Sequence, residues 1–128
     1  MSDEQTETIA NRNFEITDQF LRRIPPWHLK PDGGISSAAF QNDDGTDMMS
    51  VNWLKLSSVE HTLCGPGLIG FGVASISAGL CYSLNQNPVY SPDIDNKAHC
   101  DIVGHKTKTI SRIFSKQANY LRYPVAPP

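Results

Sequence analysis

The segment from Ala98 to Thr109, reading AHCDIVGHKTKT, holds the densest group of residues that could do chemistry. A predicted strand leads into Gly104, and a predicted helix start follows. Amide N–H groups, hydroxyls and ammonium groups converge there, and the positive end of a helix favours phosphate or carboxylate. His105 separates Gly104 from the next lysine, so the motif of a true phosphate loop is incomplete. An anion site and a capped surface helix with solvated lysines both remain open. The helix start carries Lys106, Thr107, Lys108 and Thr109.

Alternation along the same predicted strand places His99 and Asp101 on one face and Cys100 on the other. A histidine oriented by Asp101 could act as an acid–base group in phosphodiester cleavage, with an arginine stabilising the developing charge. This pattern predicts a metal-independent phosphodiesterase or ribonuclease as one candidate function. A strand with one wet face and a hydrogen-bonded histidine is the alternative. The predicted catalytic residues are His99, Asp101, Lys106 and Arg23.

Histidines and cysteines also suggest a zinc site, because these side chains are the ligands that zinc prefers. The sequence lacks the paired Cys-x-x-Cys knuckles that make such a prediction strong. Cys81 and Cys100 also fall at predicted core positions, where thiols behave as small apolar groups. A zinc-binding module is therefore the third candidate function, and outside it we expect no cofactor. The candidate ligands are His61, Cys64, His99, Cys100 and His105.

The stretch LRRIPPWHLKPDGGISSAAF concentrates cationic and aromatic residues around one loop. Tryptophan and arginine together are typical of binding hot spots. They could contact a partner or a nucleotide, or Trp27 could cover a sheet edge while the arginines point into water. The leading candidate function is a small binding module that contacts an anionic ligand or a partner protein through this loop and the helix start. Its predicted binding residues are Arg22, Arg23, Trp27, His28, Lys30, Ser36, Ser37, Gly104, Lys106, Thr107, Lys108 and Thr109.

Composition limits these candidates. The 128 residues suit one domain, and a formal charge of −2 gives no global electrostatic reason to bind nucleic acid, although a local basic patch remains open. Three cysteines, an odd count, and an acidic start unlike a secretory signal indicate reduced thiols and a cytoplasmic protein. An oligomer remains open.

The uncharged run from Thr62 to Pro92 is the one segment that could suggest a membrane span. Five glycines and a proline interrupt its apolar part, and no Lys or Arg cluster flanks it. These features favour a buried strand, a turn and a helix within a core over a membrane segment.

Periodicity and turn residues predict the elements that must position these side chains. Residues 19–24 are expected to form a strand, and Ile35–Phe40 and Met48–Trp53 a hairpin around QNDDGTD. Extended chain is expected over Leu68–Ile76, with further strands at Val89–Tyr90 and Ala98–Val103.

Three helices are predicted from capping residues and helical spacing. Ser57 and Glu60 have the spacing of a capping box for a short helix to Leu63. Ser77 is expected to cap a helix of about two turns. A C-terminal amphipathic helix is expected to start at Thr107 or Thr109 and to include Leu121.

Four stretches of the chain resemble a widespread group of short, uncharacterised bacterial proteins: Arg22–Pro26, Asp32–Phe40, Met49–Val51 and Asn96–Lys108. The resemblance covers most of the chain after about Arg22. It carries no established reaction, cofactor or catalytic residue, and it implies a bacterial-type cytosolic domain.

The expected fold is a single α+β domain over residues 13–122. A small, mostly antiparallel sheet is covered on one face by a short central helix and the C-terminal amphipathic helix. Residues 1–12 are expected to form a flexible acidic lead, and residues 123–128 a proline-rich tail.

Overall fold

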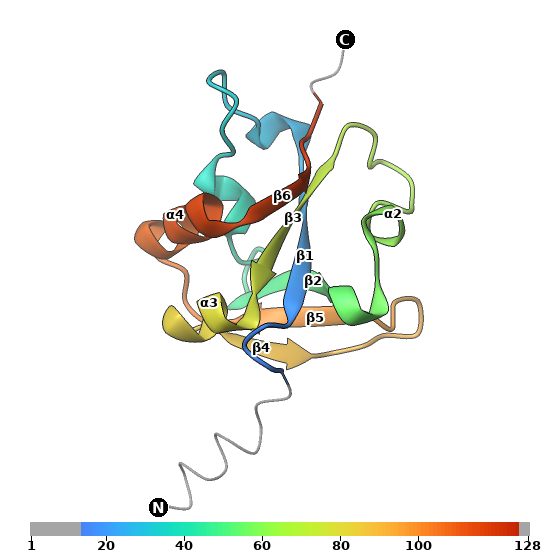
Figure 1. The fold of residues 1–128 in the computed structure, drawn as a ribbon, viewed down its shortest axis with the longest axis vertical. Coiled ribbons are helices and arrows are strands. Elements are labelled where there is room, and N and C mark those ends of the chain that lie inside the picture. The colour runs from blue at the N-terminus through green and yellow to red at the C-terminus, as the bar shows by residue number, and fades with distance from the viewer. Residues whose placement is uncertain (1–13, 126–128) are drawn as a thin grey trace, which may run out of the picture.

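One antiparallel sheet forms the centre of the molecule (Figure 1). The computed structural model describes residues 14–125, so the predicted N-terminal lead lies outside the described residues. The strand order is β4-β5-β2-β1-β3-β6, which confirms the expected α+β class. The strands are β1 (Gln19–Ile24), β2 (Met48–Trp53), β3 (Gly72–Ser77), β4 (Asn87–Tyr90), β5 (His99–Val103) and β6 (Asn119–Arg122).

Helices cover this sheet on both sides. Figure 1 shows α3 and α4 on one side of β1 and β3, and α2 on the other. The helices are α2 (Val59–Thr62), α3 (Ala78–Ser83) and α4 (Lys108–Gln117). Residues 14–125 also contain three short 3₁₀ helices: η1 (Pro26–His28), η2 (Ser37–Phe40) and η3 (Leu54–Leu56).

The main core lies between the sheet and the side that α3 and α4 cover. Alternate residues of the central strands supply it, since successive side chains of a strand point to opposite faces. Cys81 of α3 and Phe114 of α4 are fully buried in the same cluster. The strand residues in this cluster include Phe20, Ile24, Met49, Val51, Cys100 and Ile102.

The other face of the central strands is polar. Ser50 of β2 lies opposite Asp101 of β5, and Asn52 lies opposite His99. Arg23 of β1 belongs to the same face because it alternates with the buried Ile24. This face therefore brings together polar residues from three neighbouring strands.

The predicted hairpin over residues 35–53 is wrong in its first half. Met48–Trp53 forms β2, but β2 pairs with β1 and β5 instead of Ile35–Phe40. Residues 37–40 form η2, which Ser36 starts by accepting a hydrogen bond from the amide of Ala38 at 3.1 Å. Ile35, Ala39 and Phe40 are buried in the core from this irregular segment, so their burial does not depend on a strand.

Helix capping follows the predicted residues at two of three sites. Ser77 accepts from the amide of Leu80 at 3.0 Å, and Thr107 accepts from Ile110 at 3.2 Å. At α2 the predicted capping box is wrong, because Ser58 and not Ser57 caps the helix, accepting from His61 at 3.0 Å.

The C-terminal helix ends one turn earlier than its periodicity predicts. It stops at Gln117, and the residues from Asn119 to Arg122 form β6 on β3. Leu121, expected on the helix, lies exposed on this edge strand. Of the predicted tail, Pro124 is buried and the amide of Val125 donates to Gly70 at 2.8 Å.

The run from Thr62 to Pro92 contains β3, α3 and β4, and this confirms the strand, turn and helix expected there, although β3 begins only at Gly72. Within residues 14–125, no helix has both the length and the apolar character that crossing a membrane requires.

We predict that Gly72→Ala destabilises the fold by about 2 kcal/mol, because a methyl group there would overlap the backbone of the β6 region. It would meet the carbonyl oxygen of Arg122 and, at 2.6 Å, the nitrogen of Pro124. Urea unfolding measures the loss. Gly34→Ala is the control, since its nearest neighbour is the exposed side-chain carboxylate of Asp32 at 3.1 Å and not backbone. Equal stability of the two variants would contradict the close approach of β6.

Candidate functional site

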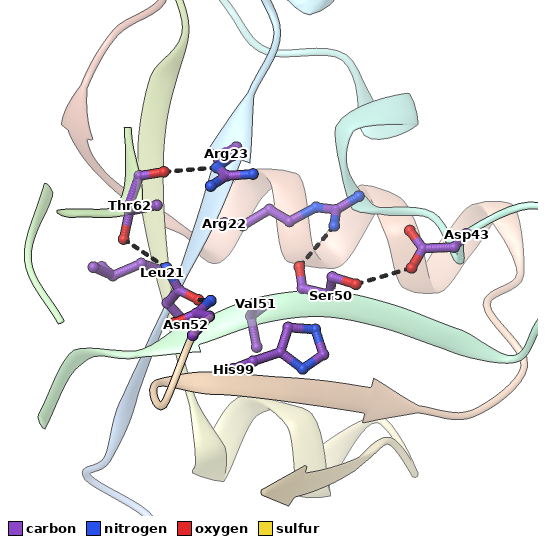
Figure 2. A pocket seen from close by; sticks show the side chains of 10 residues that line it. Leu21, Arg22, Arg23, Asp43, Ser50, Val51, Asn52, Thr62 and His99 are labelled. Carbon is purple, nitrogen blue, oxygen red and sulfur yellow. Dashed lines mark hydrogen bonds between the residues drawn. The ribbon is translucent and has the colours of Figure 1, made fainter. Parts of the chain in front are cut away.

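A cavity of about 270 Å³ lies on the polar face of the central strands. Figure 2 shows Arg22 and Arg23 on one side of it and His99 on the other. Asp43 stands at one end, and Thr62 and Asn52 stand at the other. The cavity is lined by Leu21, Arg22, Arg23, Asp43, Ser50, Val51, Asn52, Thr62, Asn96 and His99.

Arg23 presents an oriented and open guanidinium to this cavity. Its Nε donates to the carbonyl oxygen of Thr62 at 2.6 Å, which fixes the plane of the group. Its two terminal nitrogens have no protein acceptor among residues 14–125, and no carboxylate of these residues lies within 4.0 Å. The terminal N–H groups of Arg23 are therefore available to a ligand.

Arg22 contributes a second positive charge and holds the surrounding backbone. Its guanidinium donates to the carbonyl oxygens of Ala39 at 3.0 Å, Ser50 at 2.7 Å and Gln41 at 3.4 Å. Burial lowers the pKa of Arg22, the carboxylate of Asp43 opposes this shift, and the charge of Arg23 adds to it. An arginine remains protonated in proteins, so the cavity keeps both positive charges.

Hydrogen-bonded side chains fix the end of the cavity next to α2. Asn52 donates to the hydroxyl of Thr62 at 3.1 Å and accepts from the amide of Asn96 at 2.8 Å. Ser57 lies 3.1 Å from the Thr62 hydroxyl and 2.8 Å from Nδ1 of His61. This network holds Thr62 in place, and the Thr62 carbonyl in turn orients Arg23.

His99 lies beside a carboxylate, as strand alternation predicts. Its Nε2 is 3.8 Å from Oδ1 of Asp101, and its Nδ1 is 2.9 Å from the carbonyl oxygen of Ser91. Since a carbonyl oxygen only accepts, Nδ1 carries a hydrogen, and Nε2 is the atom that can exchange a proton. The Ser91 hydroxyl donates to Asp101 at 2.7 Å and fixes that carboxylate.

Lys106, predicted to join both the catalytic and the binding residues, does not line this cavity. Its ammonium group donates to Oδ1 of Asn42 and to the carbonyl oxygens of Ile102 at 2.9 Å and Gly104 at 3.1 Å. These three acceptors match its three N–H groups. The lysine therefore holds the backbone of its own turn.

The rest of the predicted helix start is also engaged with the protein. The amide of Gly104 donates to Asp47 at 2.8 Å, and the Thr107 hydroxyl caps α4. Lys108 and Thr109 are exposed. Only Lys108 of these residues lines an open groove, together with Lys30, Ser36 and Ser37 of the predicted binding loop.

Trp27 and His28 belong to neither the cavity nor that groove. Trp27 is 72% exposed, with its ring packed edge-on against Phe71 at 5.5 Å. Nδ1 of His28 is buried without a hydrogen-bond partner among the described residues. Burial, and then the charge of Arg22, lower the pKa of His28.

The candidate zinc ligands are not brought together. Among residues 14–125, no three His, Cys, Asp or Glu side chains lie close enough to hold a metal ion. Cys100 is buried in the core while its neighbour His99 lines the polar cavity. His61, Cys64 and His105 are exposed.

Sequence reasoning missed the uncharged half of the cavity. Ser50, Asn52, Thr62 and Asn96 come from β2, α2 and the β4–β5 connection, and no motif links them. The alternation of Ser50 and Asn52 with buried Met49 and Val51 was the available signal for two of them.

No family model, curated protein or solved structure matches this chain.

We predict that stability depends on the titration of Lys106, because burial lowers its pKa from 10.5 to about 8, with smaller effects from Cys81 and Arg22. Between about pH 8 and pH 10.5 Lys106 binds more protons in the unfolded chain than in the folded protein. The free energy of unfolding therefore rises with pH in this range, and the contribution of Lys106 is lost as the pH falls through about 8. Urea unfolding of the wild type and Lys106→Met, on both sides of this range, should show the wild type's relative stability increasing at high pH. A constant or shrinking difference contradicts the assignment.

Proposed function

We propose that the protein is a binding module for a small anion, held in the cavity between Arg23 and His99. The observation that carries this proposal is the guanidinium of Arg23, which is oriented through Nε by Thr62 while its terminal nitrogens have no protein acceptor among residues 14–125. Such a planar fork matches the two oxygens of a carboxylate or phosphate.

The other groups of the cavity suit the same ligand. Arg22 supplies a second charge, the Ser50 hydroxyl lines the wall between the two ends, and the Asn52 amide lies at the Thr62 end. Asp43 disfavours anions near its own end, where its carboxylate accepts from the Ser50 hydroxyl at 2.9 Å. A ligand should therefore bind with its charged group near Arg23 and any uncharged part toward Asn52.

The size of the cavity restricts the ligand to a small molecule. Its volume of about 270 Å³ is close to the lower end, roughly 300 Å³, of ordinary small-molecule sites. A phosphate ester or a di- or tricarboxylate of a few carbon atoms is the class we propose.

We predict that Arg23→Gln weakens the binding of inorganic phosphate and citrate by roughly tenfold or more, because a charge-assisted hydrogen bond contributes about 1.5–3 kcal/mol. Isothermal titration calorimetry of both probes measures the loss. Arg122→Gln is the matched control, since Arg122 is exposed, lies outside the cavity and is 3.9 Å from Glu60. Wild-type affinity in Arg23→Gln, or an equal loss in both variants, would refute the proposed site.

A metal-independent phosphodiesterase is the second candidate function. It is favoured by the position of His99, which lines the same cavity as Arg23 and whose Nε2 can exchange a proton. Lys106 has no place in this version of the mechanism, because its N–H groups donate elsewhere.

This second candidate predicts hydrolysis of bis(p-nitrophenyl) phosphate in the presence of EDTA, and loss of that hydrolysis in His99→Gln. Release of nitrophenolate measures it. A wild-type protein that binds phosphate but does not cleave the diester would exclude the phosphodiesterase and leave the binding function intact.

A further inference from the structure

A second, more open groove lies between α4 and the segment that leads into η2, and its volume is about 540 Å³. Lys30, Ser36 and Ser37 line one wall, and Lys108, Arg112 and Lys116 line the other. This groove is separate from the cavity between Arg23 and His99, since the two share no lining residue.

The positive charges of this groove form a row. Lys108, Arg112 and Lys116 are four residues apart, so they share one face of α4 and consecutive members are ~6 Å apart along the helix axis. Like charges at this spacing repel each other and destabilise an isolated helix. No carboxylate of residues 14–125 lies within 4.0 Å of any of the three.

Positive charges are also concentrated in the part of the chain that contains α4. No Asp or Glu follows Asp101, although the formal charge of the whole protein is −2. Five of the eleven Lys and Arg residues lie in this acid-free end: Lys106, Lys108, Arg112, Lys116 and Arg122. The sequence after Asp101 therefore has Lys and Arg as its charged side chains and no Asp or Glu, despite the negative total.

The groove walls are held rigidly. The hydroxyl of Ser115 on α4 donates to the carbonyl of Ile35 at 2.7 Å, and the hydroxyl of Tyr120 donates to the carbonyl of Ser115 at 2.6 Å. These bonds link α4 to the segment before η2 and to β6, so the backbones of the two walls are held together.

An aromatic pair stands at the β6 end of the groove. Tyr120 lines the groove, and Tyr123 stacks on it with ring centroids 5.3 Å apart and an interplanar angle of 29°. Tyr123 is 56% exposed, so part of its ring faces solvent.

We infer that this groove binds single-stranded nucleic acid, with phosphates along the cationic row of α4 and a base stacked on Tyr123. A row of charges matches a chain of phosphates better than one small anion, and hydroxyl groups are common additional donors to phosphate. A cationic groove beside an exposed aromatic ring is the arrangement that binds unpaired bases without sequence preference. The inference is independent of the cavity function proposed above.

Fluorescence anisotropy of labelled oligouridylate with the full chain, at salt concentrations from about 50 to 200 mM, tests the inference. The three cationic residues of the α4 row predict a log–log salt slope of roughly −2, at about −0.7 per phosphate. Arg112→Gln should weaken binding and reduce the magnitude of this slope by about 0.7. Tyr123→Leu should weaken binding roughly tenfold without changing the slope.

Lys97→Gln is the control for the loss of one positive charge. Lys97 lies in the β4–β5 connection, and Figure 1 shows this connection on the opposite side of the view from α4. It should leave both affinity and salt slope unchanged. Glutamine has helix propensity close to that of arginine, so Arg112→Gln should keep the urea midpoint of the wild type.

Three results would overturn the inference. One is a lack of oligouridylate binding by the wild type at low salt. Another is an equal effect of Lys97→Gln and Arg112→Gln, which would indicate unspecific attraction. The third is polyglutamate binding as tight as oligouridylate binding, with no effect of Tyr123→Leu on either, which would assign the groove to acidic peptides.

Discussion

The hydrogen bonds of the Arg22 guanidinium are the contacts on which both proposed anion sites depend. The guanidinium projects from β1 between the buried residues Phe20 and Ile24 and donates to three backbone carbonyl oxygens, not to a carboxylate. Hydrogen bonds to a charged group contribute about 1.5–3 kcal/mol each, which is large against a total stability of about 5–15 kcal/mol for a domain. Two of the carbonyls belong to Ala39 and Gln41, so the chain around η2 is tied to the centre of the sheet.

The hydrogen bonds of Arg22 help to position both the groove beside α4 and the cavity of Figure 2. On one side, η2 holds α4: the hydroxyl of Ser111 donates to the carbonyl of Phe40 at 2.7 Å, and the rings of Phe40 and Phe114 stack at 6.0 Å. The cationic row of α4 is thereby placed against the loop before η2. On the other side, the bond from Arg22 to Ser50 places its charge beside the cavity of Figure 2. One arginine thus supports both the proposed small-anion cavity and the proposed nucleic-acid groove on a small domain.

Local sequence patterns predicted those parts of the fold that local forces decide. The strands at 19–24 and 48–53 follow from alternation, and Ser77 and Thr107 cap helices because their hydroxyls satisfy nearby amides. Residues 35–40 were expected as a strand. Their turn conformation depends on Arg22 and Ser111, which are distant in sequence and have no local signature.

Contacts between residues distant in sequence also decide which site residues could be predicted. Alternation predicted that His99 and Asp101 share a face, and the structure places them 3.8 Å apart. It could not predict that Lys106 turns inward, because one of its acceptors, Asn42, is 64 residues away. Strand β6 was missed because it pairs with β3 at the sheet edge and has little apolar periodicity of its own. The cationic face of α4 was visible in the sequence, but the wall opposite it was not.

The central claim is that this domain has two separate places for anions, and NMR chemical-shift mapping tests it most directly. Inorganic phosphate and oligouridylate would be titrated in separate experiments into isotope-labelled protein. The account predicts that phosphate at low concentration first shifts signals of Arg23, Asn52 and Thr62, whereas oligouridylate shifts those of Lys108, Arg112 and Tyr123. Shifts of one common set of residues by both probes, or no localised shifts with either, would contradict it.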